Sequence, residues 1–350
     1  MTGKERIQAL VNGAELDRTP ISGWYHMPLV DRNVTDFTRE LIMSSDVNHW
    51  DFIKIMTNGH FYTDAYGGDI DFSRIYNQWY GTIKKYPVVT AEDLAKLPVL
   101  GIDNHVWQRE LEVFRNLKDY YGDRVPLQAT IFNPLTAVQE CMGCLNPQPI
   151  LKMMVEAPEA LHHALDAMTQ TNCIYLDALF HEGVDGIFLA NQYSIRSLLT
   201  DKQYAEFVVP YEKRILDHCK GHTWFNMAHA HGSNDLRMES YYAYGDDVLQ
   251  ALNWENCPVG VPENEVLSIR EVRSKTDKVI VAGIDQNHDM DSETNDREEV
   301  KARLVKRYLT AKEENGSNRF VFAPGCAMTT GGSYLNALLY EVVEEYGQSK

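Results

Sequence analysis

The hydrophobic positions in the second half of the chain fall into short apolar runs separated by longer amphipathic segments. Short runs predict buried strands, and apolar residues recurring every three or four positions predict helices. Strands are expected at residues 126–132, 186–190, 224–228, 247–252, 278–283 and 319–323. Helices are expected between and after them, at residues 134–144, 157–182, 201–220, 236–244, 268–274, 300–316 and 335–346. This alternation predicts a parallel sheet.

The first part of the chain is less regular. Thr2 and Glu5 have the spacing of a capping box, and the residues after them predict a short N-terminal helix. Strands are expected at 20–25 and 51–56, with a helix at 35–43 between them. Residues 61–125 mix aromatic and polar side chains, with helical patterns at 91–97 and 105–120. We interpret 61–125 as a lid or insertion, although aromatic-rich stretches are also common in ordinary packing.

Taken together, the pattern gives eight strand–helix units. The expected strands are apolar throughout, as in parallel sheets whose two faces are both buried. The sequence therefore predicts an α/β fold, a (β/α)8 TIM barrel with an N-terminal helix and an elaboration after the second strand, forming one domain over residues 1–350. A doubly wound open sheet is the structural alternative, but the sequence has no Gly-x-Gly-x-x-Gly or Walker motif to support it.

Composition narrows the range of functions. The 350 residues carry a formal net charge of −17, which argues against binding to nucleic acid or to an anionic membrane surface. Six cysteines in a chain of this length do not form a disulfide scaffold. The first residues are charged, and no apolar run approaches membrane-spanning length. A cytoplasmic location is the expectation.

In a barrel of this kind the chemistry lies at the carboxyl ends of the strands. These ends are rich in Asn, Gln, His and Tyr and poor in Lys and Arg, which disfavours a phosphate-binding mouth. Each such residue alone is more typical of a turn or helix cap than of a catalytic group. The candidates are His26, Asn58, His60, Asn133, Asn191, Gln192, Tyr193, His229, His231, Asn253, Trp254, Glu255, Asp285, Gln286 and Cys326.

Two of these ends suggest a metal site. His229 and His231 stand two residues apart at a strand end, so both imidazoles face the same side. Cys326 follows the last strand, and a His2Cys set with one open position is typical of catalytic zinc. The alternatives are polar loop histidines and a small, buried, inert thiol. Cys141 and Cys144 form a CxxC that we interpret as helix-end packing, because no second CxxC accompanies it.

In the order and spacing of its short motifs, the chain resembles the uroporphyrinogen decarboxylase superfamily, which includes cobalamin-dependent methyltransferases. The resemblance covers almost the whole chain. The motifs are Lys4–Gly13 with Asp17–Pro20, Asp51–Met56, Phe132–Thr136, His181–Gly186, His229–Gly232, Ala282–Asp285 and Pro324–Cys326.

Two departures from the family patterns carry information. Residues 24–28 lack the arginines with which the decarboxylases hold a polycarboxylate, so we expect no decarboxylation of uroporphyrinogen. Where the methyltransferases have His-x-Cys, this chain has His229-x-His231. With two neutral histidines and one thiolate, a Zn²⁺ site would carry a net charge of +1. Such a site suits polarisation of an oxygen better than activation of a thiolate.

The resemblance thus implies a zinc-dependent methyltransferase that moves a methyl group between a small O- or N-methyl substrate and a corrinoid carried by a partner protein. Expected metal ligands are His229, His231 and Cys326. Expected catalytic residues are His26, Asn191, Tyr193 and Glu255; expected substrate-binding residues are Trp24, Tyr25, His60, Asn133, Trp254 and Asp285. A homodimer is a further expectation. The alternatives are a metal-free decarboxylase of a small or tetrapyrrole acid, and a non-catalytic binding protein.

Overall fold

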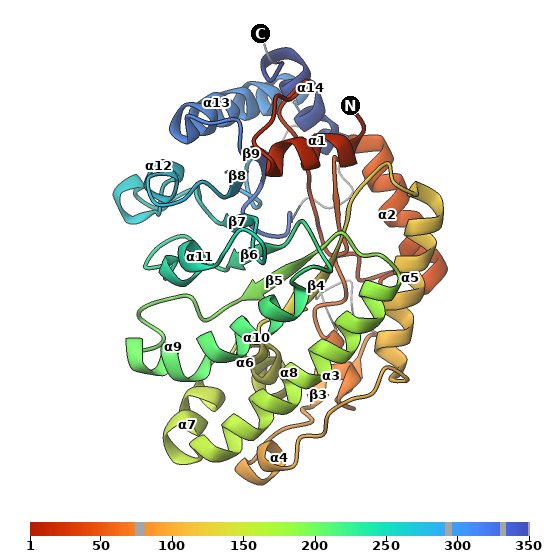
Figure 1. Cartoon of the computed structure of the whole chain (residues 1–350), viewed down its shortest axis with the longest axis vertical. Coiled ribbons are helices and arrows are strands. Elements are labelled where there is room, and N and C mark those ends of the chain that lie inside the picture. Colours follow the sequence, from red (N-terminus) through yellow and green to blue (C-terminus); the bar gives the residue numbers. More distant parts are fainter. Residues whose placement is uncertain (74–80, 291–295, 330–333, 349–350) are drawn as a thin grey trace.

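The computed structural model describes residues 1–73, 81–290, 296–329 and 334–348. Its main sheet has seven parallel strands, each paired with the next along the chain (Figure 1). The strands are β1 (Ile53–Lys54), β4 (Leu127–Phe132), β5 (Gly186–Asn191), β6 (Met227–Ala230), β7 (Ala251–Trp254), β8 (Val279–Ile284) and β9 (Phe320–Pro324).

The two edge strands, β1 and β9, are joined through residues 20–22. The Phe322 amide donates to the Pro20 carbonyl at 3.0 Å, and the Asp51 amide donates to the Ile21 carbonyl at 2.9 Å. The expected strand at 20–25 is reduced to a bridge at Ile21, because Pro20 has no amide hydrogen and the Ile21 amide donates to the Asp51 side chain at 2.8 Å. With the eighth position filled in this way, the expected (β/α)8 barrel is confirmed.

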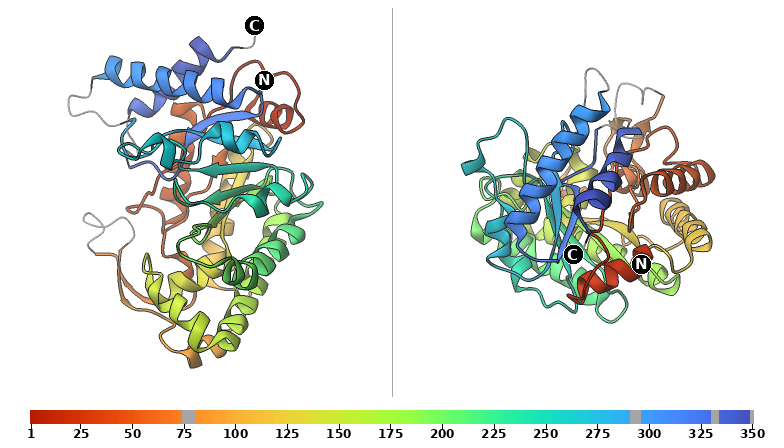
Figure 2. Two further views of the ribbon diagram at one scale, coloured as in Figure 1. Left: turned by 90° about the vertical axis from the view of Figure 1, so that its left-hand side faces the viewer. Right: turned by 90° about the horizontal axis from the view of Figure 1, so that it is seen from above.

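Helices lie outside the strands in both views of Figure 2. They are α1 (Gly3–Val11), α2 (Val34–Asn48), α5 (His105–Tyr121), α6 (Pro134–Gly143), α7 (Gln148–Glu156), α8 (Pro158–His181), α9 (Asp201–Phe207), α10 (Val209–Cys219), α11 (Glu239–Ala243), α12 (Ile269–Arg273), α13 (Arg297–Asn315) and α14 (Leu338–Tyr346). The single helix expected at 201–220 is two helices, α9 and α10. Pro210 has no backbone N–H, so it cannot donate the hydrogen bond that would continue α9.

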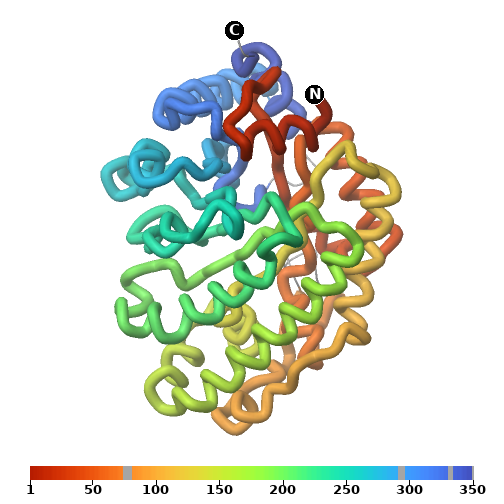
Figure 3. The backbone as a smooth tube through the Cα atoms, viewed as in Figure 1, coloured from red at the N-terminus to blue at the C-terminus, as the bar shows by residue number. Residues whose placement is uncertain are grey.

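Between β1 and β4 the chain adds α3 (Phe61–Ala65), the antiparallel pair β2 (Asp69–Asp71) and β3 (Thr82–Lys85), and α4 (Ala91–Ala95). Figure 3 shows this stretch in orange at the lower end, where α4 packs against α8. The additions fall within the segment expected to be an insertion. Helix α5, which ends that segment, belongs to the outer layer and packs on α2.

The core has two parts, one on each face of the sheet. The larger part fills the space between the strands and the outer helices. The smaller part lies inside the barrel and includes Phe52, Phe188 and Phe225 together with Ile7 and Leu10 of α1. Helix α1 therefore covers the end of the barrel at which Phe52 and Phe225 pack, and the opposite end is left for the site. Among the described residues, no helix is both long and apolar enough to cross a membrane.

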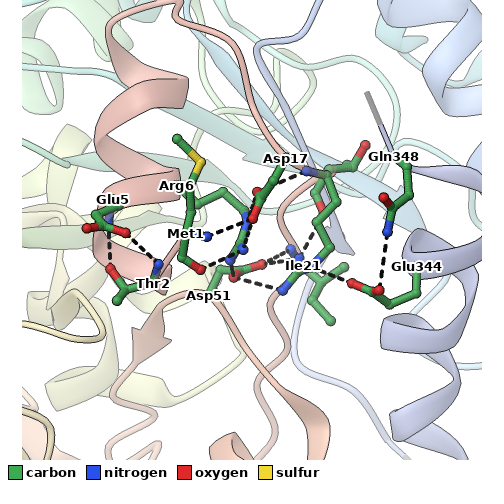
Figure 4. A network of polar contacts seen from close by, with 11 residues as sticks. Met1, Thr2, Glu5, Arg6, Asp17, Ile21, Asp51, Glu344 and Gln348 are labelled. Atoms are coloured by element: carbon green, nitrogen blue, oxygen red, sulfur yellow. Dashed lines mark hydrogen bonds and ion pairs between the residues drawn. The ribbon is translucent and has the colours of Figure 1, made fainter. Parts of the chain in front are cut away.

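A buried ionic network connects the chain segments at the end of the barrel that α1 covers (Figure 4). Asp51, which is 2% exposed, accepts bonds from Arg6, from Arg18 at 2.7 Å and from the Ile21 amide. Arg6 also pairs with Asp17. The network joins α1, the barrel-closing residues 20–22 and the residue Asp51 just before β1, so it holds the segment that fills the eighth position.

Candidate functional site

The two histidines come from the end of β6. The imidazole of His229 points into the barrel and stacks on Phe188 of the neighbouring strand, with ring centroids 5.0 Å apart. The ring of His231 lies 5.7 Å from that of His229. The chain turns sharply at Gly232, whose φ of +117° strongly favours glycine. Both rings thus face the same side of the sheet, as their spacing predicts.

Cys326 approaches these rings from the end of β9. Its Sγ lies 3.7 Å from Nδ1 of His231. One ligand atom from each of His229, His231 and Cys326 lies within 4.8 Å of the other two. The barrel therefore brings together two chain segments that are almost a hundred residues apart, and the three side chains that the sequence singles out converge.

The orientation of His229 is set by a neighbour on β7. Nδ1 of His229 lies 2.6 Å from Oδ1 of Asn253, and Nδ2 of Asn253 donates to the carbonyls of Val281 and Pro324 at 2.7 and 3.0 Å. These two donations fix the amide, so Oδ1 must accept a hydrogen bond from the Nδ1–H group of the imidazole. The lone pair is then on Nε2, in the tautomer that binds metal in proteins with such a hydrogen-bonded support.

The electrostatics of the group favour an ionised cysteine. Burial alone would raise the pKa of Cys326, but the two neighbouring histidines, with His231 as the donor at 3.7 Å, outweigh burial and hold the pKa at about 5. Burial opposes a charge on His231, yet the neighbouring Cys326 and Glu255 raise its pKa to about 9. Without a metal, the pair therefore exists as thiolate and imidazolium at neutral pH.

Glu255 lies beside this pair and is itself fixed. One carboxylate oxygen accepts from the Gly232 amide at 3.0 Å and lies 3.5 Å from Nδ1 of His231. The other accepts from Nε2 of Gln286 at 2.7 Å. Glu255 is thereby positioned as a supporting group for His231.

The three side chains open onto a cavity of about 420 Å³ at the carboxyl ends of the strands. Aromatic rings of Trp24, Phe132 and Phe188 form much of its apolar wall. The other lining residues are His26, Lys54, Met56, Gly59, Thr130, Glu140, Cys144, Leu145, Ala190, Gln192, Glu255, Gln286, Asn287, Ala327 and Thr329. Of the expected site residues, Trp24, His26 and Glu255 thus share the cavity with the three candidate ligands.

Other expected residues lie behind the cavity wall. The ring of Tyr25 packs outside the barrel against Trp50, and Trp254 is fully buried, with Nε1 donating to the Leu267 carbonyl at 2.7 Å. Each follows a residue, Trp24 or Asn253, whose side chain points inward. Successive side chains of a strand face opposite sides, so the adjacent tyrosine and tryptophan face the helices. The expected substrate contact of Tyr25 and of Trp254 therefore has no support in this placement.

Asn133 and Asn191 likewise point away from the cavity. Both donate to Oε2 of Glu212 on α10, at 2.9 and 3.0 Å, and Tyr241 and Tyr244 bond to the same carboxylate. Burial raises the pKa of Glu212 to about 7 against the opposing effect of these donors. This network holds the outer helices to the strands, which is a structural role.

Tyr193 and Asp285 also lie outside the cavity lining. Tyr193 is 1% exposed, and burial raises its pKa well above the ordinary value. Asp285 accepts from the amides of Val259 and Asn287, the latter at 2.7 Å, and so shapes the turns after β7 and β8. The expected catalytic role of Tyr193 and the expected substrate contact of Asp285 have no support in this placement.

Replacing Asn191 with alanine is expected to lower the free energy of unfolding by about 1–3 kcal/mol, because Glu212 and Tyr241 each lose a buried partner. Urea denaturation measures this change. The exposed Asn318, which donates to the Ala14 carbonyl, is the control, and its alanine variant should change stability by less than about 0.5 kcal/mol. Unchanged stability with lost metal or substrate binding would instead place Asn191 in the site.

Lys54 is one of the cavity residues that strand-end reasoning missed. Its ammonium lies over the Phe188 ring, 4.5 Å from the centroid, and contacts the Met56 sulfur. Burial lowers its pKa to about 7, opposed by the charge of Cys326. The sequence does contain a signal for Lys54. It is a charged residue inside an otherwise apolar expected strand, two residues from both Phe52 and Met56.

Comparison with known protein families is independent of the geometry of the site. The uroporphyrinogen decarboxylase (URO-D) family matches residues 49–345. The chain belongs to this family. This URO-D family member is 27% identical over 177 residues to a uroporphyrinogen decarboxylase of Carboxydothermus hydrogenoformans, covering 50% of this chain and 49% of the relative. It is 23% identical over 139 residues to a methylcobamide:CoM methyltransferase of Methanosarcina acetivorans, covering 40% of each.

These alignments span about half the length, or less, of the curated relatives. Among solved structures, a methyltransferase from Methanosarcina mazei superposes on the URO-D family member with a TM-score of 0.76, at 16% identity and over 99% of both chains. The superposition shows that the two proteins share a fold.

Proposed function

We propose that this protein is an enzyme of the URO-D family and that it acts as a zinc-dependent methyltransferase. The observation that carries the proposal is the convergence of His229, His231 and Cys326 on the cavity wall, with their ligand atoms within 4.8 Å of one another. The names of two methylcobamide:CoM methyltransferase relatives support the reaction class.

The residues present fit a zinc ion. Two imidazole nitrogens and one thiolate leave a fourth position open, as in catalytic zinc sites. The Asn253 bond presents Nε2 of His229, and Cys326 is ionised at neutral pH. With this donor set, the ion and its three ligands together carry a net charge of +1. The bound ion would supply Lewis-acid polarisation of an oxygen or nitrogen.

The proposed substrate is a small molecule with an O-methyl or N-methyl group. The aromatic rings of Trp24, Phe132 and Phe188 offer it an apolar wall, and a cavity of about 420 Å³ limits its size. Burial, with the charge of Lys54, lowers the pKa of His26 to about 3, so this residue is a neutral hydrogen-bonding group at neutral pH. His26 and Glu255 are the polar groups proposed to orient the donor.

The methyl group is proposed to pass to a corrinoid carried by a partner protein. The bond from the donor oxygen or nitrogen to the methyl carbon would break, the partner's cob(I)alamin would accept the methyl group by supplying the electron pair of the new bond, and the donor atom would take up a proton from water. The direction follows from the oxygen-polarising character of the His2Cys set, which is poorly suited to a thiolate acceptor.

Turnover tests the proposal directly. Purified protein, loaded with zinc, is mixed with cob(I)alamin and a panel of methoxyarenes, methanol and methylamines. Formation of methylcobalamin with at least one donor, and its loss after chelation, is the expected result. Zinc-loaded protein that forms methylcobalamin with none of the donors, while decarboxylating a small acid without metal, would favour the alternative enzyme class.

Decarboxylation of uroporphyrinogen is the second candidate function, because some relatives carry that name. Among the described residues, the cavity lining includes one lysine and no arginine. A substrate with many carboxylates would therefore lack counter-charges. We expect no decarboxylation above the uncatalysed background when uroporphyrinogen is incubated with the protein and products are separated by chromatography. Turnover at an ordinary enzymatic rate would refute this expectation.

A further inference from the structure

A second cluster of metal-ligating side chains lies at the same cavity. It consists of His60, Glu140 and Cys144, and one ligand atom from each lies within 4.8 Å of the other two. His60 precedes α3, Glu140 is in the last turn of α6, and Cys144 caps that helix. A spacing of four residues places Glu140 and Cys144 on one helix face, towards His60.

The buried carboxylate of Glu140 is only partly satisfied by its hydrogen bond with Cys144. The residue is 2% exposed, and its Oε2 atom has no hydrogen-bond partner in the described part of the chain. A buried carboxylate oxygen left in this way is costly, whereas a bound cation would satisfy it. Because Glu140 and Cys144 also line the cavity, an ion there could be reached from the cavity.

The imidazole of His60 is held in place by a backbone carbonyl. Its Nε2 lies 3.3 Å from the Gly81 carbonyl oxygen, which can only accept, so Nε2 carries the proton. The lone pair is therefore on Nδ1. A ligating histidine that donates its other nitrogen to a backbone carbonyl is the usual arrangement in metal sites.

We propose that His60, Glu140 and Cys144 form a second site for a divalent transition metal, with Zn²⁺ the best match to the mixed N, O and S donors. One imidazole, one carboxylate and one thiolate give a neutral site with Zn²⁺. Its remaining position is open to water or to a polar group of a molecule in the cavity. The proposal uses none of the residues assigned to the first site, so the two stand or fall separately.

Metal counting on the full chain tests the proposal. Chelator-treated protein is titrated with Co²⁺, following thiolate-to-metal absorption, and with Zn²⁺ by equilibrium dialysis. We expect two ions per chain in the wild type. One ion is expected in Glu140→Gln, which keeps the side-chain volume, and one in Cys144→Ala. Binding at the altered site should weaken by at least about 100-fold, because loss of a ligand should cost more affinity than loss of a supporting residue. Cys173→Ala, at a half-buried cysteine of α8, is the control and should keep both ions.

Combinations of variants separate this site from the first. Cys326→Ala should keep the ion held by Glu140 and Cys144, and the Cys326→Ala, Cys144→Ala double variant should bind none tightly. If the wild type binds one ion and Glu140→Gln binds it equally well, the second site is refuted and the cluster is a hydrogen-bonded acid–thiol pair. If Cys326→Ala loses no ion but Glu140→Gln does, the second site stands and the proposed function loses its metal.

Discussion

Replacing Cys326 with alanine is expected to remove one zinc ion per chain and to abolish methyl transfer, while the barrel stays folded. Cys326 supplies the sole thiolate of the first site, and it is ionised at neutral pH through its contacts with His229 and His231. Loss of a supporting residue of a metal site costs about 10–100-fold in affinity, and loss of a ligand should cost more. Zinc content after dialysis, and methylcobalamin formation, measure the two effects.

The matched control is Cys173→Ala, which removes a thiol of helix α8 that lies in neither ligand group. It should keep wild-type zinc content and turnover. Circular dichroism of the Cys326→Ala variant checks that the fold survives. A Cys326→Ala protein that retains every zinc ion and full turnover would remove the metal from the proposed mechanism.

Replacing Asp51 with alanine is expected to lower the free energy of unfolding by about 3–5 kcal/mol. The change leaves the guanidinium groups of Arg6 and Arg18 buried without their central partner, and breaking a buried ion pair on one side has a cost of this size. It also removes the acceptor of the Ile21 amide in the segment that closes the barrel. Urea denaturation followed by tryptophan fluorescence measures the loss.

Asp123→Ala is the control for this change. Asp123 pairs with Lys4 at 2.6 Å, but its side chain is 82% exposed, and surface pairs of this kind contribute little to stability. A loss below about 1 kcal/mol in the Asp51 variant would show that the network at the closed end is not what holds the eighth strand. That result would leave the cavity and its ligands unaffected, because they lie at the other end of the strands.

The three candidate ligands could be singled out from the sequence because barrel topology alone brings their positions together. Any residue at the end of β6 or β9 lies on the mouth of a closed barrel, and the His229–His231 spacing is independent of the exact strand register. The inward or outward direction of a single residue depends on that register. A shift by one residue moves a side chain to the other face, which is why Tyr25 and Trp254 were expected in the cavity but pack outside it.

Other cavity residues were missed because they were not expected at strand ends. Glu140 lies in a helix whose residues are all buried, and Lys54 falls inside the strand expected at 51–56, although β1 in fact ends at Lys54. In both cases, a charged residue within a largely apolar stretch of sequence could have indicated a residue of the site. The assignment of residues 1–350 to one domain, and the lid role of 61–125, stay predictions, as do the partner protein and the homodimer.

X-ray absorption at the zinc edge tests the central claim most directly. The Glu140→Gln variant, loaded with one zinc ion per chain, isolates the site formed by His229, His231 and Cys326. The account predicts one sulfur at about 2.3 Å and two histidine nitrogens at about 2.0–2.1 Å, with the remaining position filled by a light atom, and loss of the sulfur when Cys326 is also replaced by alanine. Zinc surrounded only by oxygen and nitrogen in the Glu140→Gln variant would contradict it.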